Sequence, residues 1–164
     1  MAWLQIGTLW LHVLGGILWF GGDVYANLVV TPVLATLPPQ QQRRVGHLLR
    51  ERGERVIFPI ALATIALGVV SGTVFGPVRS GEVLFGTLYG VTWLVSFIVA
   101  VGVALWDPLV LDRQVERVLE DDRSWVPGEE KGPLVLHRAF GLFLIELSGF
   151  LVIFSAMILM RFGL

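Results

Sequence analysis

Residues 5–30 read QIGTLWLHVLGGILWFGGDVYANLVV, an apolar stretch long enough to cross a bilayer that nevertheless carries His12 and Asp23. Ionisable side chains are costly in hydrocarbon, so those found there indicate function. At about 100° per residue, a set of polar and small residues of this stretch, together with Trp19, falls within about 60° of His12. They are Gln5, Thr8, His12, Gly15, Gly16, Trp19, Asp23, Ala26 and Asn27. We therefore expect a spanning helix whose polar stripe faces protein or a bound cofactor.

The whole chain has the composition of a membrane protein. Of its 164 residues, 55% are hydrophobic and 15% are charged, which lies outside the range of soluble globular proteins. Four apolar runs each supply the roughly 20 residues that a spanning helix needs. These runs are residues 3–36, 56–77, 83–106 and 134–160. The sequence thus predicts an all-α, up-down-up-down bundle of four transmembrane helices in a single domain, residues 1–164. Between the last two helices, residues 109–123 are expected to form an amphipathic helix on the membrane surface.

The distribution of basic residues predicts the orientation. Ten of the twelve Lys and Arg residues lie between the first and second runs, or between the end of the third run and the start of the fourth at Arg138, and only Arg79 and Arg161 lie elsewhere. By the positive-inside rule, the two basic segments are cytoplasmic and both termini lie outside, in a multi-pass protein of the cell (inner) membrane. We expect the lipid bilayer as the main partner and no nucleic acid, and the chain is compatible with a homo-oligomer. The absence of cysteines excludes disulfides and thiolate ligands.

The fourth run contributes the second deeply placed ionisable residue, Glu146. In antiparallel helices, residues at equal depth have a constant sum of residue numbers, and this sum is 169 both for Asp23 with Glu146 and for His12 with Met157. We therefore expect Asp23 to lie level with Glu146 near the middle of the membrane, and His12 level with Met157 near its outer side. The two carboxyl groups are the candidates for a catalytic or proton-transfer role.

A haem pocket is one interpretation of the polar stripe. Haem iron takes a histidine as an axial ligand, often with His or Met on the opposite side, and the flat macrocycle needs a slot lined by small and aromatic residues. In this hypothesis His12 is the ligand to haem b, and Gly15 and Gly16 make room for the ring. Trp19 lines the slot, and Met157 is the choice for the sixth position. His137, at the inner end of the fourth run, is the alternative iron ligand.

The motif LHxxGGxxWFGG in residues 11–22 is followed by an Arg-rich segment and by an apolar run that ends near Gly72. Over residues 3–77 the chain resembles a superfamily of small membrane proteins. This superfamily includes the haem-binding, four-helix type of protoporphyrinogen IX oxidase and the CopD-like copper-resistance membrane domains. The resemblance implies haem binding at His12. The oxidases also have a functional Lys near the start of their third helix, and here no Lys lies between Arg79 and Arg113. The resemblance therefore favours a membrane haem protein with a redox or electron-transfer role over porphyrinogen oxidation itself.

Two other classes of function are left open by the residues. In a CopD-like protein that handles or transports copper, His12, Met157 and Met160 would form a path for Cu(I), which prefers imidazole and thioether ligands. In a structural membrane protein, Asp23 and Glu146 would only form hydrogen bonds between helices. An absorption spectrum separates a haem protein from these alternatives.

Overall fold

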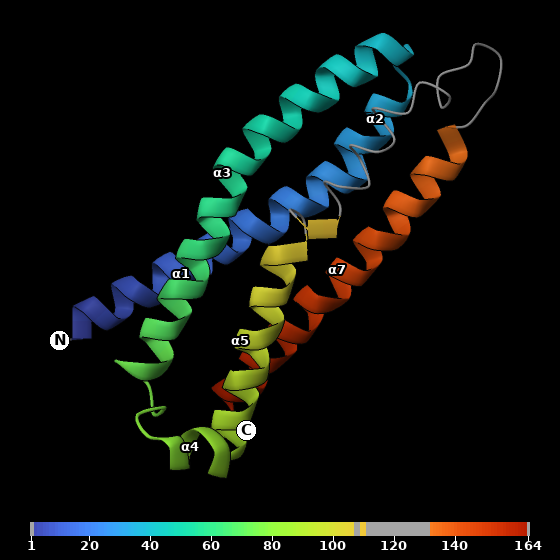
Figure 1. The fold of residues 1–164 in the computed structure, drawn as a ribbon. Coiled ribbons are helices and arrows are strands. Elements are labelled where there is room, and N and C mark those ends of the chain that lie inside the picture. The colour runs from blue at the N-terminus through green and yellow to red at the C-terminus, as the bar shows by residue number, and fades with distance from the viewer. Residues whose placement is uncertain (1, 107–108, 111–131, 164) are drawn as a thin grey trace.

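The structure, a computed structural model, describes residues 2–106, 109–110 and 132–163 (Figure 1). Within these residues the chain is helical and contains no strand, which confirms the predicted all-α class. Four of the helices are long and apolar enough to span a membrane, as the sequence predicts. The predicted amphipathic helix at residues 109–123 lies outside the described residues from position 111 onward.

The first apolar run forms one continuous helix that is interrupted by a single π-helical turn. Helix α1 spans Ala2–Tyr25, a π-helical turn η1 spans Ala26–Val30, and α2 spans Thr31–Ala35. Pro32 lacks an N–H and its ring would clash with the carbonyl one turn earlier, so the wider turn just before it relieves the crowding. The hydroxyl of Thr31 also donates to the carbonyl oxygen of Ala26 at 3.0 Å, which ties the widened turn together.

The second run begins earlier than the sequence predicts. Helix α3 spans Pro39–Thr73 without interruption, so the helix that contains the predicted run 56–77 begins well before that run and ends at Thr73. The polar first half of α3 is rich in Gln, Arg, Leu and Glu, which all favour helix. Their charges alone do not end a helix. Pro59 removes one N–H but lies on an exposed face. The turn before α3 is closed by Gln42, whose amide donates to the carbonyls of Ala35 at 3.1 Å and Leu37 at 2.8 Å.

The third run is divided in two. Helix α4 spans Gly81–Gly86 and α5 spans Leu88–Trp106, with Thr87 between them in an extended conformation. The hydroxyl of Thr87 accepts from the N–H of Gly90 at 3.0 Å, so Thr87 caps α5. The predicted single helix at residues 83–106 is therefore corrected to a short helix followed by the spanning one. The fourth run, α7, spans Gly132–Arg161, close to the predicted 134–160.

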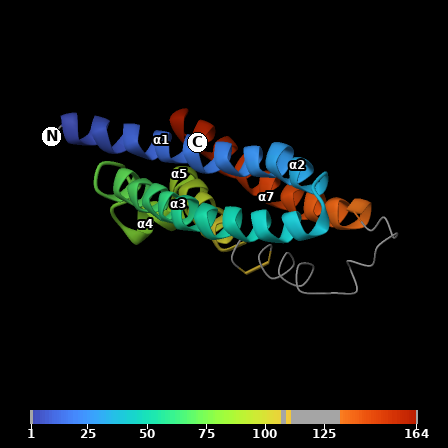
Figure 2. The same ribbon diagram turned by 90° about the horizontal axis from the view of Figure 1, so that it is seen from above.

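The helices pack chiefly as two pairs, α1 with α3 and α5 with α7. Figure 1 shows α3 returning beside α1, and Figure 2 shows the same two helices side by side from above. The pairs meet at a small core formed by Trp19 of α1, Ala61 of α3, Val103 and Ala104 of α5 and Phe150 of α7. This core fixes the position of α1 relative to the other three long helices.

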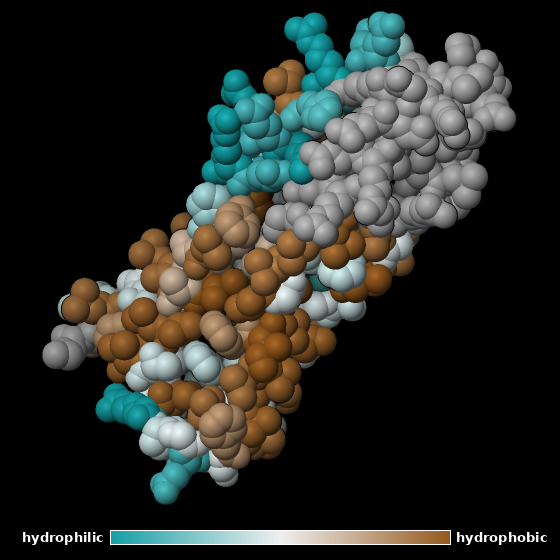
Figure 3. Space-filling view, viewed as in Figure 1, coloured by the Kyte–Doolittle hydropathy of each residue, from teal (hydrophilic) through white to brown (hydrophobic). Residues whose placement is uncertain are grey.

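The surface carries a broad apolar belt between polar ends. In Figure 3 the apolar residues cover the middle of the visible face, and hydrophilic residues gather over the first half of α3 and near α4. The spans that are apolar enough to cross a membrane are Ala2–Ala35, Gln40–Thr73, Leu88–Trp106 and Phe140–Arg161. Because large apolar side chains are exposed along this belt, the structure suits an apolar surrounding.

Candidate functional site

The candidate site is centred on His12, which lies half-buried between α1 and α3. Its Nδ1 atom is 2.8 Å from the backbone carbonyl oxygen of Thr64. Since a carbonyl oxygen only accepts hydrogen bonds, Nδ1 carries the proton in this contact. In the neutral ring the lone pair then resides on Nε2. Histidines that ligate metals are typically oriented in this way, with the second ring nitrogen donating to a carbonyl or carboxylate.

Two glycines make this contact possible. A Cβ atom on Gly68 would lie 2.9 Å from Cε1 of His12, closer than carbon atoms pack, so the ring rests directly on the backbone of α3. One turn along α1, Gly15 faces the Thr64 side chain, whose hydroxyl donates to the carbonyl of Ile60 at 2.8 Å. The small residues therefore bring α1 and α3 close enough for an imidazole to reach a main-chain carbonyl.

The residues predicted to line a haem slot have different surroundings. Gly15 is occupied by its contact with Thr64, and Trp19 is only 4% exposed, because it lies in the core. The Trp19 ring meets the Phe150 ring edge-on at 5.1 Å between centroids. Gly16, one turn from His12, has no atom within 4 Å of an added Cβ. Of the predicted slot, the open space thus lies beside Gly16, whereas Trp19 packs in the core.

Aromatic contacts join α1 and α7 near the core. The residue numbers of Trp19 and Phe150 sum to 169, the value predicted for residues at equal depth. The Phe20 ring also meets the Phe154 ring at 5.1 Å, and these numbers sum to 174, so the contacts do not single out one register. Met157, half-buried on α7, lies one turn beyond Phe154. The hydrogen bond described for His12 joins it to α3, so ligation by Met157 stays a prediction.

The two membrane carboxyl groups are both buried. Asp23 is 7% exposed and Glu146 is 2% exposed. Asp23 lies one turn from Trp19, Glu146 lies one turn from Phe150, and these two rings touch. Both carboxyl groups therefore lie one turn from the core, and their common level in the membrane stays a prediction. A proton-transfer role for them stays a prediction.

Three further side chains of this chain could in principle bind a metal, namely His47, His137 and Met160. His47 is exposed on the charged half of α3. His137 belongs to the first turns of α7, and its side chain is outside the described part of the structure. Met160 is half-buried near the end of α7. Among the residues that the structure describes, no group of three or more His, Cys, Asp and Glu side chains is placed to hold a metal ion.

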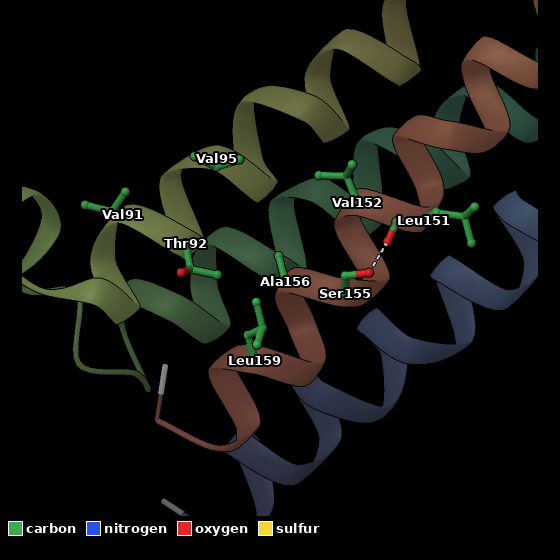
Figure 4. Close-up of a pocket in the computed structure, with 8 residues that line it drawn as sticks. All are labelled: Val91, Thr92, Val95, Leu151, Val152, Ser155, Ala156 and Leu159. Carbon is green, nitrogen blue, oxygen red and sulfur yellow. Dashed lines mark hydrogen bonds between the residues drawn. The ribbon is translucent and has the colours of Figure 1, made fainter.

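A shallow apolar groove of about 400 Å³ lies between α5 and α7 (Figure 4). Its lining is formed by Val91, Thr92, Val95, Leu151, Val152, Ser155, Ala156 and Leu159. The Ser155 hydroxyl donates to the Leu151 carbonyl at 2.7 Å, so it offers little to a polar ligand. The groove is on a different helix pair from His12 and is suited to alkyl chains.

Sequence reasoning missed the partner of His12. Thr64 and Gly68 belong to the run at residues 56–77, which contains no titratable group and therefore gives no direct sign of a polar contact. The available signal was the spacing of small residues, because Ala61, Thr64, Gly68 and Gly72 recur at intervals of three and four along one face of α3. Such a face indicates close approach by another helix, which the structure shows to be α1 at Thr64 and Gly68, whereas Gly72 lies against Trp93 of α5.

Comparisons of the chain with protein-family models, with curated proteins and with solved structures find no match.

Proposed function

We propose that the protein is an integral membrane haem-b-binding protein in which Nε2 of His12 would ligate the iron. The contact between His12 Nδ1 and the Thr64 carbonyl oxygen carries this proposal, because it leaves the lone pair on Nε2 and holds the ring in one orientation. Haem brings four nitrogen ligands of its own, so a single well-oriented histidine is a sufficient protein contribution. The donor chemistry of the site therefore fits this cofactor.

The other residues of the site support this role through packing. Gly68 sets the depth of the imidazole against α3, and Gly16 leaves open space on α1 one turn from His12. Trp19 anchors α1 in the core, which keeps the ligand helix from rotating. When bound, the haem would supply reversible one-electron redox chemistry, so we propose a role in electron transfer or in a membrane oxidoreductase.

The test of the cofactor is its measured content in the purified protein. We expect about one haem b per chain by the pyridine haemochrome assay and no stoichiometric copper by plasma mass spectrometry. A colourless preparation that carries copper would overturn the proposal and favour copper handling through His12, Met157 and Met160. The cells are supplied with a haem precursor during expression, so that a shortage of haem in the cells is not mistaken for a failure of the protein to bind it.

We also propose that the four spans cross the membrane as an up-down-up-down bundle with both termini outside. The ten basic residues of the two inner segments support this orientation. Ser80, the N-cap of α4, and Ser124 then face opposite sides of the membrane. Because the chain lacks cysteine, Ser80→Cys and Ser124→Cys each introduce a single thiol. An impermeant maleimide added to intact cells should label the first variant and not the second, and labelling of both from outside would contradict the topology.

A further inference from the structure

The outward face of α1 has a regular pattern that its packing within the chain does not use. At alternating intervals of three and four residues, the residues on this face are Leu4, Gly7, Leu11, Leu14, Leu18 and Gly21. We call this set the outer seam of α1. All six residues are exposed, with exposed fractions of 48–69% for the four leucines. Alternation of three and four is the spacing with which one helix packs along another in a left-handed pair.

The glycines of the outer seam distinguish it from an ordinary lipid-facing surface. Gly15 and Gly22 on the same helix each meet a side chain of α3, so their lack of a Cβ is accounted for by packing. Gly7 and Gly21 have no atom within 4 Å of an added Cβ. In a bilayer, helices associate through close packing at small residues, since lipid is as apolar as leucine. Two glycines on a leucine seam therefore provide the close approach that a second helix needs.

The partner that fits this surface is a second copy of the same chain. A two-fold axis along the membrane normal places two α1 helices side by side in the same direction, so each seam meets its own copy in register. The seam contains no charge, so the two copies do not repel each other. Of the four spans, α1 is also the least covered, with 11% of its most apolar stretch buried against 17–22% for the others. We propose that the protein forms a homodimer through the outer seam of α1.

The available area is sufficient for such a dimer. Trp3 and Trp10 flank the seam and are 84% and 71% exposed. An aromatic side chain buries about 150–250 Å², so these two residues on both copies provide about 600 Å². The leucines of the two seams bring the total past the roughly 1,000 Å² that a specific interface needs.

Single cysteines test this arrangement without background, because the chain has no native cysteine. In native membranes under mild oxidation, Leu11→Cys and Leu18→Cys should each give a disulfide-linked dimer. The matched control is Leu9→Cys, because Leu9 lies at nearly the same depth as Leu11, is 51% exposed, and lies on the side of α1 opposite the seam. Cross-linking at Leu11 and Leu18 but not at Leu9 supports the dimer. Equal cross-linking at Leu9, or none at Leu11 and Leu18, would overturn it and leave lipid as the covering of this face.

The glycines provide a second test. Adding Gly7→Leu and Gly21→Leu to the Leu11→Cys variant should lower the cross-linked fraction by about tenfold, because the helices can no longer approach closely. Gly102→Leu on α5 is the control, since Gly102 is also exposed with no atom within 4 Å of an added Cβ. An unchanged cross-linked fraction in the Gly7/Gly21 variant, with the control also unchanged, would refute close packing at the glycines. Neither test depends on haem, so the dimer can fail while the proposed cofactor site stands.

Discussion

Replacing Gly68 by leucine is expected to separate His12 from Thr64 and to lower the haem affinity of the protein by about tenfold or more. Even the Cβ atom of the new side chain would lie 2.9 Å from Cε1 of His12. Either the ring must turn away from the Thr64 carbonyl or α1 must move away from α3. Overpacking of this kind typically costs about 1–3 kcal/mol. The measurement is the haem affinity of the purified apoprotein, followed by absorbance during haem titration.

Two control variants separate the contact from general damage to α3. Thr64→Val removes the hydroxyl but keeps the main-chain carbonyl that accepts from His12, so its haem affinity should remain close to that of the unaltered protein. Gly102→Leu adds the same side chain at an open position on α5 and should also have little effect. If Gly68→Leu binds haem as tightly as these controls, the orientation of His12 by α3 is not required for the site.

Replacing His12 by alanine is expected to have the largest effect on cofactor binding. Loss of a residue that only orients a metal ligand costs about 10–100-fold in affinity, so loss of the ligand itself should cost at least about 100-fold. The protein should be isolated nearly free of haem while remaining folded, because the Trp19 core is unaffected. Circular dichroism and gel filtration in detergent check the fold, and the pyridine haemochrome assay measures the haem.

The other two histidines are the controls for this substitution. His47 is exposed on the charged half of α3, and His47→Ala should retain full haem. His137→Ala should retain it as well if His12 is the ligand. Loss of haem in His137→Ala with retention in His12→Ala would move the assignment to His137, the alternative that the sequence leaves open.

Much of the fold could be predicted from hydropathy because each span has to be apolar over its own length. The boundaries of the helices could not, since the end of an apolar run is not the end of a helix. On α3 the first half is polar, yet Arg50 with Glu54 and Glu51 with Arg55 form ion pairs at 2.8 and 2.6 Å one turn apart, a pattern that supports continued helix. Exposed ion pairs of this kind add little stability, but their spacing of four residues is the spacing that a continuous helix brings together.

The candidate site was predictable to the level of one helix. The angular pattern identified His12 as inward-facing, and the structure places its ring against α3. What the ring contacts depends on how closely two helices approach, and this is set jointly by Gly15 on one helix and Gly68 on the other. Information of this kind is divided between distant parts of the sequence. A pattern read along a single helix does not contain it.

The central claim is that Nε2 of His12 ligates the iron, and chemical rescue tests it most directly. His12→Gly removes the side chain and leaves space in which free imidazole can take its place. The measurement is the absorption spectrum of the purified haem-supplied protein, recorded for the unaltered chain and for His12→Gly with and without imidazole. We predict a Soret band in the unaltered protein, its loss in His12→Gly, and its return when imidazole is added. A His12→Gly protein that shows the full, unchanged haem spectrum without imidazole would contradict the claim.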